Sequence, residues 1–166
     1  MPEINQLITQ LAAALVKRDY RLITAESCTG GLVASQLTSI PGSSTWFEGA
    51  FVTYRLSAKE RMLGVPASVL EDFGAVSEPT ARAMAEGALS ASDAQISIAV
   101  TGIAGPEGGD VVTPVGTVWF AWALQPEPQT PPRCIQTARH ALEGSREQVR
   151  ERAVGIALAG ALASLG

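Results

Sequence analysis

The sequence is poor in the residues from which metal and redox sites are built. Its 166 residues include one histidine, His140, and two cysteines, Cys28 and Cys134. One histidine is too few for a histidine-based metal site, and no cysteine–histidine cluster has the spacing of zinc ligands. We therefore expect no metal and no cofactor, and we expect both cysteines to be free thiols rather than a disulfide.

Long apolar runs and an excess of basic charge are also missing. No apolar run approaches the roughly 20 residues that a membrane-spanning helix needs. The first residues, Met1 to Ile4, lack the basic and apolar regions of a secretory signal. The formal net charge of −4 argues against binding to a nucleic-acid backbone, which requires a basic surface. The sequence predicts a cytoplasmic protein with neither a membrane nor a nucleic acid as partner.

What the chain does contain is typical of one compact α/β domain. Hydrophobic residues make up 46% of the sequence and charged residues 17%, and the length favours a single domain over residues 1–166. Strand-like and helix-like segments alternate, which predicts a three-layer α/β/α sandwich around a mixed, mostly parallel sheet of about five strands. The expected strands are 21–26, 48–54, 95–101, 115–124 and 133–138. The expected helices are 3–19, 29–39, 57–63, 66–72, 79–91 and a last one that begins after Ser145.

The most informative run is Ala25–Gly31, which joins the first expected strand to a helix. The first N–H groups of a helix have no partner inside the helix, and the helix dipole favours negative charge in front of them. A hydroxyl at this position faces donors for an oxyanion. Ser27 is therefore a candidate nucleophile, and the N–H groups of Thr29, Gly30 and Gly31 are candidate oxyanion donors.

A serine nucleophile needs a neighbouring base. Histidine is nearly absent, so we expect the alternative of a Ser–Lys pair. Of the two lysines, Lys17 lies on the polar side of a helix, whereas Lys59 follows the second expected strand, near the sheet edge where active-site loops gather in open α/β folds. Tyr54, at the end of that strand, is placed to relay a proton between Ser27 and Lys59 or to hold the serine in orientation.

Two neighbours of Ser27 leave alternatives open. Cys28 is either a rival nucleophile, since a helix N-terminus favours the thiolate, or a small buried thiol that packs under the helix. Glu26 is either a partner of Lys59 or part of a separate ion pair at the end of the sheet.

Two further features suggest a bound anion. The glycine-rich run Thr101–Pro106 follows a strand, and glycines let the backbone approach a ligand closely. It does not match the phosphate-loop pattern G-x-x-x-x-G-K-[ST], and a plain surface turn explains it equally well. Arg146 stands at the first turn of the last helix, where the helix dipole disfavours a cation. It is either an exposed arginine or a residue that binds a group such as phosphate.

Motifs along nearly the whole chain resemble, in order, those of the CinA C-terminal-domain family. They are Ala25–Gly31, Pro41–Phe47, Val52–Tyr54, Ala58–Lys59, Gly74–Pro79, Thr101–Pro106, Pro114–Val118 and Gly144–Arg146.

The resemblance implies the family's typical activity, hydrolysis of the amide of nicotinamide mononucleotide to nicotinic acid mononucleotide and ammonia. It implies that Ser27, Tyr54 and Lys59 are catalytic, and that a homo-oligomer forms. It also implies that Thr101 and its glycines, Gly102 and Gly105, line the nucleotide site with Arg146. Two other functions stay open, a non-catalytic nucleotide-binding module and a Cys28-dependent amidase.

The chain departs from the family pattern at two places. Arg55-Leu56 stands where relatives have Ser-Asn, and Ser145 replaces the aspartate of Gly-Asp-Arg. Arg55 brings a cation close to Lys59, which would either depress the pKa of the lysine or change which nucleotide fits.

Overall fold

A five-stranded sheet forms the centre of the molecule in the computed structural model, which describes residues 3–166. Its strand order is β2-β1-β3-β4-β5. β1 pairs in parallel with β2 and β3, whereas β4 is antiparallel to both β3 and β5. The mixed, mostly parallel sheet is as predicted, because β4 alone runs against the direction of the other four strands. The strands are β1 (Leu22–Glu26), β2 (Phe47–Val52), β3 (Ile96–Gly102), β4 (Thr117–Leu124) and β5 (Arg133–Ala141).

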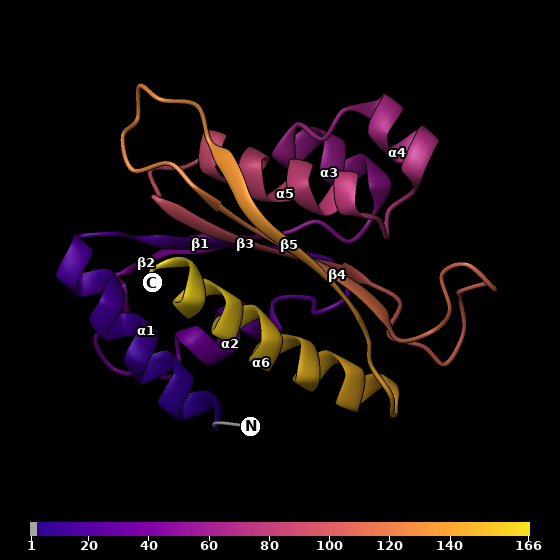
Figure 1. The fold of residues 1–166 in the computed structure, drawn as a ribbon, viewed down its shortest axis with the longest axis horizontal. Helices are drawn as coiled ribbons and strands as arrows, with labels where there is room; N and C mark the ends of the chain where they lie inside the picture. Colours follow the sequence, from indigo (N-terminus) through magenta and orange to yellow (C-terminus); the bar gives the residue numbers. More distant parts are fainter. Residues whose placement is uncertain (1–2) are drawn as a thin grey trace.

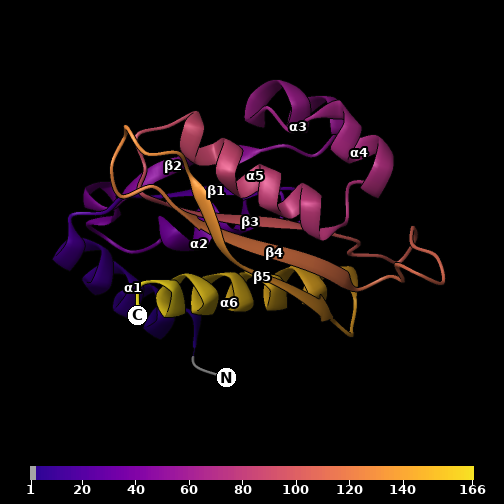
Figure 2. The ribbon, with the colours of Figure 1, turned by 45° about the horizontal axis from the view of Figure 1, so that its top comes forward.

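Helices cover both faces of the sheet, which confirms the predicted three layers (Figures 1 and 2). One face carries α1, α2 and α6, and the other carries α3, α4 and α5. The helices are α1 (Ile4–Arg18), α2 (Leu32–Leu37), α3 (Leu56–Leu63), α4 (Ala67–Phe73), α5 (Glu78–Ser90) and α6 (Arg146–Ser164), and a 3-10 turn, η1 (Ser43–Thr45), precedes β2.

The last helix, α6, packs its small residues against the sheet. A Cβ atom at Gly160 would collide with the ring of Trp122 on β4, so the absence of a side chain lets helix and ring meet. The indole N–H of Trp122 donates to the carbonyl oxygen of Ala157 at 2.9 Å. The capping box predicted at the start of α6 is confirmed, because Ser145 and Gln148 satisfy each other's backbone N–H groups.

The carboxyl ends of the three parallel strands lie side by side at one edge of the sheet. Glu26 is opposite Val52 of β2 and Val100 of β3. Hydrogen bonds extend this alignment beyond the strands, from the N–H of Ser27 to the oxygen of Val100 at 3.0 Å and from the N–H of Thr53 to the oxygen of Glu26 at 2.8 Å. Residues that follow different strands are thereby brought to the same place.

The largest differences in length from the predictions are in α2 and β5. α2 begins at Leu32 rather than at 29, because Gly30 and Gly31 take φ angles of +57° and +99° and form a turn before the helix. Positive φ is accessible to glycine at little cost. β5 continues to Ala141, since its pairing with β4 extends to Thr117.

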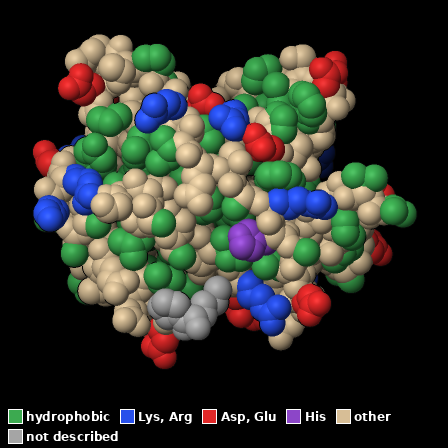
Figure 3. All heavy atoms as spheres, in the orientation of Figure 1, with side chains coloured by type: hydrophobic (Ala, Val, Ile, Leu, Met, Phe, Trp, Pro, Cys, Tyr) green, Lys and Arg blue, Asp and Glu red, His purple; other side chains and the backbone are tan. Residues whose placement is uncertain are grey.

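The face drawn in Figure 3 carries basic and acidic side chains interspersed among neutral ones, so this face has no continuous basic surface. Within residues 3–166, no helix has both the length and the apolar character needed to cross a membrane.

Candidate active site

Ser27 and Lys59 meet at the edge where the parallel strands end. Ser27 directly follows β1, and Lys59 lies on α3, the helix after β2. The Nζ atom of Lys59 is 3.0 Å from the Oγ atom of Ser27. The lysine is fully buried and the serine is 8% exposed. A potential nucleophile therefore stands within hydrogen-bond distance of a potential base.

The surroundings of Lys59 favour its uncharged form. Its Nζ atom donates to the carbonyl oxygens of Thr53 at 2.7 Å and Tyr54 at 3.1 Å, as well as to Ser27. All three partners are neutral, and burial lowers the pKa of Lys59 from 10.5 to about 8. Burial, and not the neighbouring cation Arg55, is the cause of this shift in pKa. A measurable share of the amine is thus uncharged near neutral pH.

A pocket of about 240 Å³ opens onto this pair. It collects seven of the ten residues that the sequence pointed to, which come from four separate parts of the chain. The seven are Ser27, Tyr54, Lys59, Thr101, Gly102, Gly105 and Arg146.

Tyr54 and Arg146 stand together at the open side of this pocket. The guanidinium of Arg146 donates to the hydroxyl of Tyr54 at 3.2 Å and to the carbonyl oxygen of Gly105 at 2.7 Å. The Tyr54 side chain is 61% exposed. Its contact with Lys59 is made through the backbone carbonyl, and its hydroxyl is held by Arg146. The arrangement therefore holds the hydroxyl at the open side of the pocket.

The end of β3 and the loop after it also line the pocket. The hydroxyl of Thr101 donates to the carbonyl oxygen of Ala75 at 2.7 Å, which ties β3 to the segment before α5. A Cβ atom at Gly102 would lie 2.8 Å from the carbonyl oxygen of Thr117, so no larger residue fits there without movement. Gly105 has a φ angle of +86° and presents its carbonyl oxygen to Arg146.

Thr29, Gly30 and Gly31 lie in the turn behind Ser27 and are not among the pocket residues. The N–H of Gly30 donates to the carbonyl oxygen of Ser27, and the N–H of Gly31 donates to the carboxylate of Glu26. Both groups are thus engaged, which removes two of the three expected oxyanion donors. Of the three, only the N–H of Thr29 has no acceptor within the described residues 3–166.

Glu26 caps the second helix rather than pairing with Lys59. The side chain is fully buried, and its carboxylate accepts hydrogen bonds from the N–H groups of Gly31, Val33 and Ala34 at 3.0–3.1 Å. The hydroxyls of two threonines complete its partners, at 2.7 Å and 3.0 Å. The first N–H groups of a helix and its dipole together stabilise a carboxylate at this position. Glu26 therefore fixes the turn that presents Ser27.

Cys28 lines the pocket but is poorly suited to be the nucleophile. Its side chain is 5% exposed and belongs to the hydrophobic core under α1, α2 and α6. Burial raises the pKa of its thiol from 9.0 to about 11 and outweighs the lowering effects of the backbone and of Arg150. The thiol is therefore protonated near neutral pH, and only the thiolate is a strong nucleophile.

Arg150 is a contact that sequence reasoning missed. Its guanidinium donates to the carbonyl oxygens of Cys28 at 3.1 Å and Thr29 at 3.0 Å. The sequence did contain a signal for this residue, because Arg150 lies four positions after Arg146. Residues four apart on a helix share a face, so the two arginines should point in similar directions.

Comparison with known proteins agrees with this architecture. The family model described as CinA C-terminal domain matches residues 4–165. The nicotinamide-nucleotide amidohydrolase PncC of Enterobacter agglomerans is 44% identical over 159 residues, which are 96% of this chain and 93% of that protein. A CinA-like protein of Akkermansia muciniphila is 57% identical over 111 residues, 67% of this chain, and the match spans 27% of that longer protein.

A solved structure shows the same fold. The crystal structure of a competence or damage-inducible protein from Enterobacter asburiae superposes with a TM-score of 0.91 and 38% identity, covering 100% of both chains. With a family model that matches almost every described residue and a relative that matches over nearly its full length, this chain belongs to the CinA C-terminal domain family.

Proposed function

We propose that this protein hydrolyses the carboxamide of nicotinamide mononucleotide, with Ser27 as nucleophile and Lys59 as its base. The observation that carries this proposal is the 3.0 Å contact between the Lys59 amine and the Ser27 hydroxyl. Lys59 is buried, and its pKa is lowered to about 8. An uncharged amine in this position is able to take the serine proton, as in known Ser–Lys hydrolases.

In the first half of the reaction, the Ser27 proton passes to Lys59 while the serine oxygen attacks the carboxamide carbon. The carbonyl oxygen becomes an oxyanion, for which the N–H of Thr29 is the remaining donor among those expected from the sequence. The C–N bond then breaks, and the proton held by Lys59 goes to the leaving nitrogen, so that ammonia departs and an ester to Ser27 remains.

In the second half, water attacks the ester carbon and its proton goes to Lys59. The bond between the carbon and the Ser27 oxygen breaks, and Lys59 returns the proton to the serine. Nicotinic acid mononucleotide is released, and the pair is restored. One base thus serves both halves, which requires that its pKa lie near the working pH.

Arg146 and Tyr54 are proposed to bind the phosphate end of the substrate. A guanidinium pairs well with a phosphate, and this one is held on the open side of the pocket by Gly105 and Tyr54. In this assignment Tyr54 positions Arg146, and Lys59 acts on Ser27 without a relay. Thr101, Gly102 and Gly105 line the same pocket, and we assign them to the wall that receives the pyridine ring.

The name of the Enterobacter agglomerans relative supports the choice of reaction, because that protein is called a nicotinamide-nucleotide amidohydrolase and matches this chain almost from end to end. The buried thiol of Cys28 argues against a cysteine amidase, since burial raises its pKa to about 11.

The test is ammonia release by the purified protein from a panel of pyridine carboxamides: nicotinamide, its riboside and its mononucleotide. We expect turnover to be fastest with the mononucleotide, to be lost in Ser27→Ala, and to be largely kept in Cys28→Ala. Binding of the mononucleotide without ammonia release would indicate a nucleotide-binding module instead. Loss of activity in Cys28→Ala with activity kept in Ser27→Ala would transfer the nucleophile to the thiol.

A further inference from the structure

We propose that Arg150 is a positioning residue that holds the turn behind Ser27 and directs the N–H of Thr29. This inference rests on the proposed roles of Ser27 as nucleophile and of the Thr29 N–H as oxyanion donor. Arg150 is half-buried on α6 and reaches across to the turn between β1 and α2, more than 120 positions earlier in the chain. It lies outside the pocket and contacts neither Ser27 nor Lys59 among its hydrogen-bond partners within residues 3–166.

The two hydrogen bonds from Arg150 fix the directions of two successive peptide groups. Its Nε atom donates to the oxygen of Cys28, and its Nη2 atom donates to the oxygen of Thr29. A trans peptide is planar, so its C=O and N–H bonds point in opposite directions. Holding the Cys28 oxygen therefore aims the N–H of Thr29 away from Arg150. That N–H is the expected oxyanion donor that remains after Gly30 and Gly31 are paired.

The positive charge of Arg150, which donates to the carbonyl oxygen of Cys28, also makes the N–H of Thr29 in the same peptide group a stronger hydrogen-bond donor. Hydrogen bonds in a chain polarise one another, and a donor with a positive charge does so more than a neutral one. Lysine is a poor substitute, because its single ammonium does not reproduce the planar, two-point grip of a guanidinium. The side chain of Arg150 packs closely on the turn, since a Cβ atom at Gly30 would lie 3.5 Å from Nη2.

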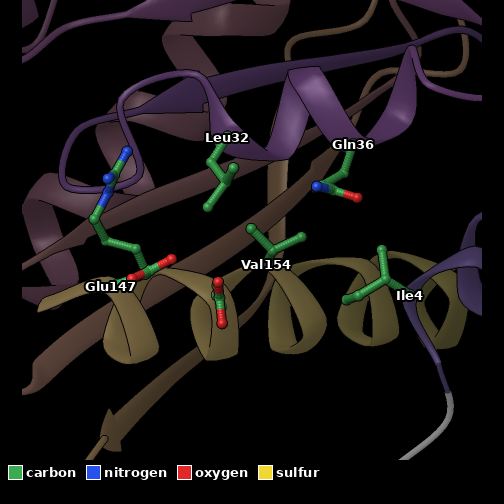
Figure 4. A pocket seen from close by; sticks show the side chains of 7 residues that line it. Ile4, Leu32, Gln36, Glu147 and Val154 are labelled. Atoms are coloured by element: carbon green, nitrogen blue, oxygen red, sulfur yellow. The ribbon is translucent and has the colours of Figure 1, made fainter. Parts of the chain in front are cut away.

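Solvent can reach this arrangement through a groove on the helix face of the molecule. The groove has a volume of about 350 Å³ and is lined by Arg150 together with residues of α1, α2 and α6. Figure 4 shows Leu32 and Gln36 on α2 facing Val154 on α6, with Ile4 at one end and Glu147 at the other. If the Arg150 side chain is removed, a small guanidinium ion has a path to the vacated position.

The test uses a probe that does not depend on the substrate. An alkyl fluorophosphonate reacts with an activated serine: the Ser27 oxygen bonds to phosphorus, fluoride leaves, and the serine proton goes to Lys59. The phosphoryl oxygen then occupies the oxyanion position. The rate of labelling is measured from the increase in mass of the intact protein. It depends on the reactivity of Ser27 and on the geometry of the turn that holds the oxyanion. Arg152→Gln is the matched control, since Arg152 lies on the same helix and donates to the exposed carbonyl of Glu143.

We expect Arg150→Gln to slow labelling by about 10- to 100-fold, less than the roughly 10²- to 10³-fold effect of deleting a donor outright. Arg150→Lys should lie between this variant and the wild type, and Arg152→Gln should label at the wild-type rate. In Arg150→Ala, added guanidinium should restore part of the rate, and sodium at the same ionic strength should not. General destabilisation of the fold would not be relieved in this way, because guanidinium itself weakens folded structures.

Equal labelling rates in wild type, Arg150→Gln and Arg150→Lys would overturn the inference and leave the proposed function standing. Rapid labelling of Ser27 without ammonia release from the mononucleotide would overturn the proposed substrate and leave the role of Arg150 intact. If Arg150→Gln fails to fold, Arg150→Lys decides the matter, and a wild-type rate in that variant counts against the proposal.

Discussion

Arg146 donates a hydrogen bond to the hydroxyl of Tyr54 at 3.2 Å, which holds that hydroxyl at the open side of the pocket. The tyrosine reaches Lys59 only through its backbone oxygen, at 3.1 Å. The sequence suggested two roles for the Tyr54 hydroxyl, a proton relay and an orienting contact with the serine. The observed geometry points to a third, support of the arginine that we assign to the phosphate.

Tyr54→Phe separates these roles. The substitution keeps the ring and the backbone contact with Lys59 but removes the acceptor for Arg146. We expect KM for nicotinamide mononucleotide to rise several-fold while kcat stays within about threefold, since uniform binding is lost and the base is untouched. Steady-state kinetics at fixed pH provide the measurement. A fall in kcat of about 100-fold or more would instead indicate that the hydroxyl takes part in proton transfer.

Arg146→Gln should weaken the discrimination between the nucleotide and the riboside. The pairing of a guanidinium with a phosphate is charge-assisted, and glutamine retains hydrogen bonding without the charge. We expect kcat/KM for the mononucleotide to fall by about 10- to 100-fold, equivalent to roughly 1.4–2.7 kcal/mol. The value for the riboside should change little. Equal losses for both substrates would show that Arg146 supports the site without reading the phosphate.

Lys59→Arg should abolish turnover although it preserves a positive charge. An arginine stays protonated in proteins and so cannot accept the serine proton. We expect a loss of about 10²- to 10⁴-fold in kcat, both for this variant and for Lys59→Met. Lys17→Arg is the control, because Lys17 is exposed on α1. If Lys59→Arg kept more than a tenth of the activity, the lysine would be acting through its charge alone.

Glu26→Gln should destabilise the turn that carries Ser27. The substitution replaces one carboxylate oxygen by a donor that faces the N–H groups at the start of α2, and it removes the negative charge that the helix dipole stabilises. We expect the free energy of unfolding to fall by about 2–4 kcal/mol, as measured by chemical denaturation.

Glu48→Gln is the matched control for that measurement. Glu48 forms a 3.8 Å ion pair with the exposed Arg21 at the opposite end of the sheet. Surface pairs of this kind contribute about 0–1 kcal/mol. Equal losses of unfolding free energy in the two variants would show that the capping of α2 by Glu26 contributes no more to stability than a surface ion pair does.

The alternation of strands and helices was enough to predict the layers, because each apolar strand must be covered on both faces. The order of the strands was harder to predict. The connections from β3 to β4 and from β4 to β5 are short and contain no helix, which favours antiparallel pairs, but nothing local shows that β1 lies between β2 and β3. The same limit applies to α2, where two glycines at positive φ shorten the helix in a way that apolar spacing does not reveal.

The residues of the candidate site were likewise predictable only in part. Ser27 and Lys59 were predictable because each follows a parallel strand, and such strand ends meet at one edge. The role of Glu26 depends on the direction of its side chain. The sequence does not show whether the carboxylate points toward Lys59 or toward the first N–H groups of α2. Arg150 depends on how α6 docks, which brings a residue near the end of the chain to a turn near its start.

The central claim is that the amine of Lys59 is uncharged often enough to accept the proton of Ser27. The chain has only two lysines, so Lys17→Arg leaves Lys59 as the sole lysine, and its side-chain NMR signal can be titrated without ambiguity after isotope labelling. We expect the Lys59 amine to lose its proton with a midpoint near pH 8, as its pKa of about 8 requires, and activity should rise with pH through the same midpoint. A midpoint at or above the ordinary lysine value of 10.5 would contradict the account.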